Sequence, residues 1–231
     1  MRIKNFLSIL LVLVTVNLFA INEPRYEPGS NNKNNFKEVI TNLKTLSASF
    51  KQYNVSNNKK KFESSGKLYI SKPNKFRWDI MNPNTQILVS DGKKFINYDV
   101  DLEQVSIKTI NNINKDTPIY ILSGDYESIE KNYNISVENS SKKSNKNLEA
   151  YILSPKEEKK VKQVKKGSEN EKEQNISAVK LTFSDKILQS IEIYSNNKLI
   201  TLINLSRVIL NKNISLKKFK VHIPKNVEIL K

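Results

Sequence analysis

The first regularity in the chain is an almost unbroken apolar run, FLSILLVLVTVNLFA, over residues 6–20. Arg2 and Lys4 precede it and give the N-terminus a positive charge. The run is short for a membrane-spanning helix, and its length and charged start are typical of a signal peptide. We therefore expect residues 1–20 to be a signal peptide cleaved after Ala20. An uncleaved N-terminal anchor is the alternative.

The next segment is polar and then becomes amphipathic. Residues 21–35 contain two prolines and several asparagines, so we predict a flexible lead-in. From residue 36 the apolar residues recur at steps of three, four and seven, which is typical of one face of a helix. This stripe predicts a long helix and consists of Phe36, Val39, Ile40, Leu43, Leu46, Phe50 and Tyr53.

Beyond residue 66 the period of the apolar positions changes to two, which predicts half-buried strands. Asp91-Gly92 is a strong hairpin-turn signal between two of them. One short helix interrupts the series, because Thr117-Pro118 resembles an N-cap followed by proline at the first helical position, with Gly124 as the stop. The predicted strands lie near residues 68–70, 76–80, 85–90, 95–98, 105–107, 135–137, 150–153, 179–183, 191–193, 199–205 and 219–223.

The order of these elements predicts the fold class. Strands that follow one another along the chain favour an antiparallel sheet that is strongly curved or barrel-like, and no βαβ repetition is present. The fold class is therefore mostly β with helices (α+β). A low-complexity tract with seven Lys and five Glu in residues 156–173 predicts a solvated insertion at about 156–177. We expect residues 36–231 to form a single domain around it.

Composition excludes several kinds of chemistry. The chain has no Cys, one His and five Gly, which excludes disulfides, thiol catalysis, multi-histidine metal sites and glycine-rich phosphate loops. Asp99, Asp101 and Glu103 have the rhythm of a calcium loop but lack its glycine and its final glutamate. We expect His222 to be a surface imidazole. We predict no catalytic residue, no metal and no cofactor, although a pair of carboxylates that meets only in three dimensions stays open.

The charge balance is strongly basic. The chain has 39 Lys+Arg against 23 Asp+Glu, a formal net charge of +16. Nearly all the basic residues are lysines, and asparagine and isoleucine are abundant, which is typical of AT-rich codon usage. Nucleic-acid readers favour arginine for bidentate contacts, so we expect no nucleic-acid partner.

A series of segments in the middle of the chain resembles the periplasmic lipoprotein carrier family, the LolA type. Their order and spacing, behind a signal peptide and an amphipathic helix ending SASFKQ (47–52), are more specific than any one of them alone. The series is GKLYISKPNKFRW (66–78), P-x-x-Q-ILVSDGKKFINYD (83–99), DLEQV (101–105) and TPIYIL (117–122). Weaker likeness extends to YILSPK (151–156) and FKVHIPKNVEIL (219–230), where Asn226 stands in the family's glycine slot.

The resemblance implies an incomplete, strongly curved antiparallel β-barrel, with an N-terminal helix and a helical lid over an apolar cavity. It implies a non-enzymatic chaperone, a monomer in the periplasm. This chaperone would take triacylated lipoproteins from an inner-membrane ABC-type release complex to an outer-membrane lipoprotein acceptor. A lipid-sensing regulator or an outer-membrane acceptor of related fold is the alternative, although an acceptor lipoprotein would carry a cysteine after the signal. A more remote alternative is a secreted hydrolase or a polyanion-binding protein.

The resemblance also assigns candidate residues for lipid binding. The lid latch would be Lys72, in a position where the family commonly has an arginine that binds lid carbonyls. Arg77 faces away from Phe76 and Trp78 on the predicted strand, which makes it a doubtful substitute. The lid would present Ile119, Tyr120, Ile121 and Leu122. The cavity would be lined by Leu68, Ile70, Phe76, Trp78, Ile80, Ile87 and Val89, and some of these would be ordinary core residues.

Overall fold

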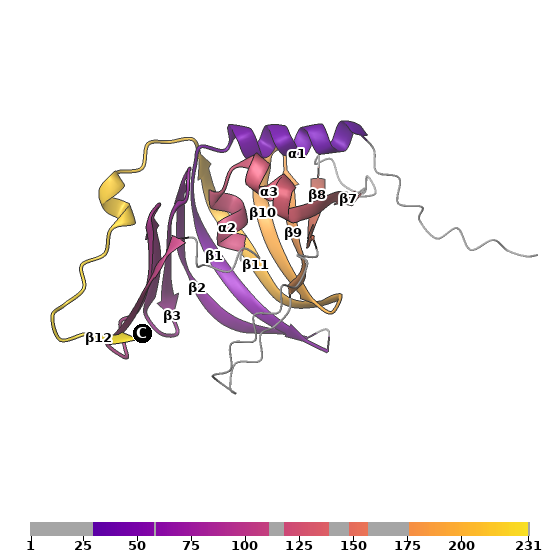
Figure 1. Ribbon diagram of the computed structural model, residues 1–231. Coiled ribbons are helices and arrows are strands. Elements are labelled where there is room, and N and C mark those ends of the chain that lie inside the picture. The colour runs from indigo at the N-terminus through magenta and orange to yellow at the C-terminus, as the bar shows by residue number, and fades with distance from the viewer. Residues whose placement is uncertain (1–29, 58, 111–117, 139–147, 157–175, 231) are drawn as a thin grey trace, which may run out of the picture.

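One large sheet dominates the computed structural model, which describes residues 30–57, 59–110, 118–138, 148–156 and 176–230 (Figure 1). Its twelve strands lie in the order β12-β6-β5-β4-β3-β2-β1-β11-β10-β9-β8-β7. The strands are β1 (Thr45–Ser56), β2 (Lys59–Ser71), β3 (Lys75–Asn82), β4 (Gln86–Asp91), β5 (Lys94–Asp99), β6 (Gln104–Thr109), β7 (Tyr133–Glu138), β8 (Leu148–Pro155), β9 (Ile176–Ser184), β10 (Ile187–Ser195), β11 (Lys198–Leu210) and β12 (Glu228–Leu230). The helices are α1 (Ser30–Asn42), α2 (Pro118–Ser123), α3 (Tyr126–Asn132) and the short 3₁₀ helix η2 (Leu216–Phe219).

The sheet is mixed and open. Eleven of its strands are joined by antiparallel pairing, whereas β12 runs parallel to β6. The edge strands β12 and β7 do not pair with each other. The prediction of a mostly β fold with helices is therefore confirmed, but the sheet is mixed and not strongly curled, where an incomplete, strongly curved antiparallel barrel was expected. The parallel pair arises because the chain crosses one face of the sheet after β11 before it reaches β6.

The predicted long helix is wrong beyond residue 42. Helix α1 begins at Ser30, within the predicted lead-in, and ends at Asn42, while Leu46, Phe50 and Tyr53 belong to strand β1. Residues 46 and 50 fit a helical stripe and also a two-residue alternation, because Ala48 between them is buried as well. Residues 46 and 50 form part of a strand because β1 is hydrogen-bonded to both β2 and β11.

The main hydrophobic core lies between the three α-helices and one face of the sheet, which we call the inner face (Figure 1). Helix α1 contributes Phe36 and Ile40, both completely buried. Fully buried strand residues meet them from both halves of the sheet, among them Leu46, Leu68 and Ile191. The sheet and its helices are thus one packed unit.

The opposite face, which we call the outer face, is covered in its β3–β6 part by the C-terminal segment. Phe219 ends η2 and is buried, while Val221 and Ile223 pack against a second small cluster formed by Tyr98, Val105 and Val227. The predicted last strand at 219–223 is wrong, because this segment packs on the face of the sheet through alternate side chains without joining an edge.

Helix α3 was not predicted from the sequence. Asp125 is its N-cap and accepts a hydrogen bond from the backbone N–H of Ser128 at 2.6 Å. Glu127 in the first turn and Lys131 in the last turn suit the helix dipole. These three residues were the available signal for this helix.

No helix in the described ranges is long and apolar enough to cross a membrane. Four predicted features lie wholly or mostly outside the described residues: the signal peptide at 1–20, the lead-in before Ser30, the N-cap at Thr117 and nearly all of the Lys/Glu-rich insertion.

Candidate functional site

The candidate site is built on strands β2 and β3 at the inner face. Cross-strand pairing places Ile70 opposite Phe76, and Leu68 opposite Trp78. Leu68, Ile70 and Phe76 are buried, whereas Trp78 and Ile80 are half-buried and pack against the main core. Alternation along β3 therefore brings the predicted residues of these two strands together on one face.

Two predicted cavity residues lie on the wrong face. Ile87 is opposite Asp79 and Val89 is opposite Arg77 on the outer face, and Ile87 packs against the outer cluster. Leu88 lies opposite Trp78 and faces inward instead. Residues 87–89 are all apolar, so the sequence does not show which of them face inward. A shift of one residue in the assumed alternation placed Ile87 and Val89 on the inner face and Leu88 on the outer face, the reverse of the observed arrangement.

Two inner-face residues were missed by sequence reasoning. Phe95 on β5 packs against the main core, and its ring centroid lies 5.9 Å from that of Phe76. Phe50 on β1 is buried, and its ring contacts Trp78 edge-on at 4.9 Å between centroids. The inner face thus carries a band of aromatic rings that spans β1, β3 and β5.

Helix α2 covers this band. Ile119 is nearly buried, Ile121 and Leu122 are completely buried, and all three belong to the same core as Phe76. Tyr120 is half-buried. The short helix predicted at 119–122 is confirmed, and three of its four predicted lid residues pack toward the inner face.

The turn between β2 and β3 contacts both covering helices. The Lys72 ammonium donates a hydrogen bond to the backbone carbonyl of Ile40 in the last turn of α1, at 2.9 Å. Two residues on, the backbone N–H of Asn74 donates to the carbonyl of Ser123, the last residue of α2, at 2.9 Å. A single turn therefore holds the C-terminal ends of two helices, and the bond of Lys72 goes to α1 instead of the predicted helix α2.

Lys72 is an unusual lysine. Burial lowers its pKa to about 8, against opposing contributions from the nearby carboxylates of Asp125 and Glu127, while Lys44 lowers it further. An ammonium at the C-terminal end of a helix interacts favourably with the carbonyl dipoles there. The cost of removing this charge from water outweighs that interaction.

A cavity of about 190 Å³ lies beside the C-terminal end of α1. Most of its lining is apolar, and its polar residues are Asn42, Lys186 and Asn211. The Asn211 side chain accepts hydrogen bonds from the backbone N–H groups of Lys44 and Thr45 and donates one to the carbonyl of Asn42. The connection between α1 and β1 is thereby fixed next to the cavity.

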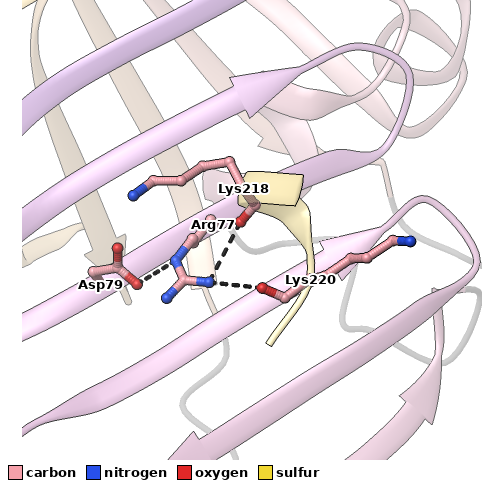
Figure 2. Close-up of polar contacts among 4 residues, drawn as sticks. All are labelled: Arg77, Asp79, Lys218 and Lys220. Carbon is pink, nitrogen blue, oxygen red and sulfur yellow. Dashed lines mark hydrogen bonds and ion pairs between the residues drawn. The ribbon is translucent and has the colours of Figure 1, made fainter. Parts of the chain in front are cut away.

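The Arg77 side chain lies on the outer face, which agrees with the prediction that it faces away from Phe76 and Trp78. Its guanidinium donates to the backbone carbonyls of Lys218 and Lys220 at 3.3 and 3.0 Å, and to the Asp79 carboxylate at 2.6 Å (Figure 2). The Lys218 ammonium lies 4.3 Å from the centre of the Tyr69 ring. Arg77 therefore anchors the C-terminal segment and takes no part in holding the helices of the inner face.

The inner-face site offers apolar surface and few polar groups. Within the described ranges, no group of three or more acidic or histidine side chains could hold a metal ion. The His222 side chain is exposed, as predicted. The arrangement suits the binding of an apolar ligand under helices that could move away, with recognition by burial instead of directed bonds.

Comparison with known proteins agrees with this geometry. The chain matches the family "Outer membrane lipoprotein carrier protein LolA" over residues 41–222. It is 30% identical over 189 residues to the outer-membrane lipoprotein carrier protein of Legionella pneumophila (strain Lens), covering 82% of this chain and 84% of that protein. It is 26% identical over 194 residues to the outer-membrane lipoprotein carrier protein of Pseudomonas syringae pv. tomato, covering 84% of each.

A solved structure also shares the fold. An uncharacterized conserved protein from Thermus thermophilus superposes with a TM-score of 0.55 at 12% identity, covering 87% of this chain and 98% of that one. The fold is therefore shared at a low level of sequence identity. The family match covers most of the chain, including the band of inner-face residues on β2 and β3 and helix α2. The chain belongs to the LolA family of outer-membrane lipoprotein carrier proteins.

Proposed function

We propose that this protein is a periplasmic carrier that shields the acyl chains of lipoproteins on their way to the outer membrane. The observation that supports this most is the continuous apolar band on the inner face, from Phe50 through Trp78 to Phe95, under helix α2. Members of the family carry cargo and are not enzymes, which agrees with the expectation of a non-enzymatic chaperone.

The physical need for such a carrier follows from transfer free energies. Each methylene moved from water to an apolar site is worth about 0.8 kcal/mol, so several acyl chains together would not cross an aqueous compartment unescorted. The empty carrier must bury the same surface with its own side chains. In the proposed cycle Ile121 and Leu122 of α2 occupy the place that acyl chains take when cargo is bound.

The proposed lining consists of Leu68, Ile70, Phe76, Trp78, Ile80 and Leu88, with Leu88 in place of Ile87 and Val89. In this proposal the sheet bends around the acyl chains as an incomplete barrel. The proposed lid is α2, and the proposed latch is the β2–β3 turn, where Lys72 holds α1 and Asn74 holds α2. A ligand opens this cover only by the difference between its affinities for the open and closed states.

The proposed partners are those of the carrier pathway. Triacylated lipoproteins are the cargo, an inner-membrane ABC-type release complex supplies them, and an outer-membrane lipoprotein acceptor receives them. The carrier acts as a monomer after export by its signal peptide.

Native mass spectrometry of the exported protein with a triacylated lipoprotein tests this proposal. We expect a one-to-one complex that is lost in Phe76→Glu and in Trp78→Glu, because a carboxylate on the inner face opposes acyl binding. Phe76 is buried, whereas Trp78 is half-buried. Ile107→Glu is the matched control, because Ile107 is 43% exposed and lies opposite Ile96 of the outer cluster. Equal loss in the control, or an unchanged complex in Trp78→Glu, would overturn the proposal.

A further inference from the structure

The β1–β2 hairpin ends in an unusual basic tip. Lys59, Lys60 and Lys61 follow one another at the start of β2, and all three are exposed. Only one acidic residue, Glu63, lies between residues 51 and 67, and its carboxylate accepts a hydrogen bond from Asn54. Among the described residues the three lysines form no ion pair. Their charge is therefore directed at solvent.

The tip also presents an apolar side chain. Phe62 directly follows the three lysines, and its side chain is 47% exposed. Its ring contacts that of Tyr53 edge-on, at 6.2 Å between centroids. Packing against Tyr53 on the neighbouring strand holds the phenyl ring at the surface. An aromatic ring flanked by lysines is the pattern of side chains that rest at a membrane–water interface.

The tip reaches beyond its neighbour in the sheet. Pairing between β2 and β3 begins at Ser65 and Asn82, so none of the described strands pairs with residues 59–64 on that side. Asn54 pairs with Thr201, which brings the β10–β11 turn and the exposed Lys198 to the same end of the sheet. This end lies away from α1 (Figure 1). The charges thus gather at one extremity of the molecule, beside the β10–β11 turn.

We propose that this tip, formed by Lys59, Lys60, Lys61 and Phe62, is a docking surface for anionic lipid bilayers. The lysines meet acidic headgroups as point charges, and the phenyl ring enters the headgroup region. The exposed phenyl ring favours a bilayer over a nucleic acid or a sulfated polysaccharide, neither of which offers an apolar phase. The proposal goes beyond cargo binding, since it concerns the bilayer itself and needs no lipoprotein.

Vesicle co-sedimentation tests the proposal with the exported, purified protein. Vesicles of phosphatidylglycerol and phosphatidylcholine should bind it, pure phosphatidylcholine vesicles should not, and binding should weaken as salt rises. Each lysine near an anionic surface is worth about a fivefold change in partitioning. Reversal of the three lysines (K59E/K60E/K61E) should therefore lower partitioning by about a hundredfold or more.

The matched control applies the same change of charge at the other end of the sheet. Lys93, Lys94 and Lys108 are exposed near the β4–β5 turn, so K93E/K94E/K108E changes the net charge equally. This variant should keep at least most of the binding. Equal loss in both triple variants would show that only net charge matters and would overturn the proposal, as would binding to heparin without binding to vesicles.

A fluorescence measurement tests the role of the aromatic ring. The chain has a single tryptophan, Trp78, so Phe62→Trp in a Trp78→Phe background places the only indole at the tip. Its emission should shift to the blue on anionic vesicles and be quenched by brominated lipid. An unchanged emission spectrum of vesicle-bound protein would contradict insertion of the ring. Unchanged vesicle binding of K59E/K60E/K61E would overturn the proposal and would indicate that the lysines only protect the free strand edge from pairing with other chains.

Discussion

The two faces of the sheet are covered in different ways. On the inner face, α1 and α2 are held mainly by buried apolar side chains, and at the β2–β3 turn their ends are fixed by the bonds of Lys72 and Asn74. On the outer face, the C-terminal segment also packs through Val221 and Ile223, and it is held in addition by the two carbonyl bonds of Arg77 and by the backbone hydrogen bonds of the parallel β12–β6 pair. An acyl chain can replace apolar contacts but cannot replace directed hydrogen bonds. In the proposed carrier cycle we therefore assign the helices as the movable cover and the C-terminal segment as the fixed one.

The largest predicted effect concerns the framework that both covers share. A Cβ atom on Gly66 of β2 would lie 1.8 Å from the backbone oxygen of Asp79 on β3. Gly66→Ala must therefore push the two strands apart, and we expect it to lower the free energy of unfolding by about 3 kcal/mol. Urea unfolding measures this. Ser65→Ala is the neighbouring control, and equal stability of the two variants would contradict the close approach.

The next prediction loosens the outer cover alone. The side chains of Arg77 and Asp79 are only 15% and 17% exposed. Arg77→Met removes two bonds to the C-terminal segment and leaves the Asp79 carboxylate without its guanidinium, at a cost of about 2 kcal/mol. Hydrogen exchange should rise in residues 216–230. Lipoprotein binding should be unchanged, and its loss would break the distinction between the two covers.

A pH titration addresses the inner cover through Lys72. Because burial lowers its pKa to about 8 from 10.5, the unfolded chain binds more protons at this group between these two values. The free energy of unfolding should therefore rise with pH across that window, by on the order of 2 kcal/mol. The full cost of burying the charge persists below pH 8.

The control for this titration is Lys72→Met, since other lysines and tyrosines also titrate in alkaline solution. The difference in unfolding free energy between the two proteins should change with pH from 8 to 10, as the wild type gains stability that the variant does not. Parallel pH profiles for the wild type and Lys72→Met would show that the ammonium is not held in a buried site.

The smallest effect is expected at the exposed ion pair between Lys186 and Glu38, which joins the β9–β10 turn to α1 at 2.6 Å. Both side chains are at least half exposed, so water and salt screen the interaction. Lys186→Gln should leave both stability and lipoprotein binding within error of the wild type. A clear loss of binding would mean that polar contacts hold α1 more than its apolar face does.

The strand pattern could be predicted from the sequence where one face of the sheet is buried. Phe76, Trp78 and Ile80 alternate with charged residues on β3, so their common face was evident. Alternation fails where apolar residues are consecutive, as in residues 87–89, because only the pairing of β3 with β4 decides which one faces inward.

The boundary between α1 and β1 shows another limit of sequence reasoning. Leu46 and Phe50 are four residues apart and fit either a helix or a strand. The choice is made by β2 and β11, which follow later in the chain and supply the backbone partners of β1. The C-terminal segment posed the same difficulty, because Val221 and Ile223 alternate like a strand but pack on the outer cluster as irregular backbone.

The most direct test of the central claim uses the only tryptophan in the chain. Trp78 lies half-buried on the inner face, in contact with Phe50 and beneath the proposed acyl path. Binding of a triacylated lipoprotein with brominated acyl chains should quench its fluorescence, while the same lipoprotein with unbrominated chains should not. A stable complex in which Trp78 emission is equally unaffected by both would contradict acyl binding at the inner face.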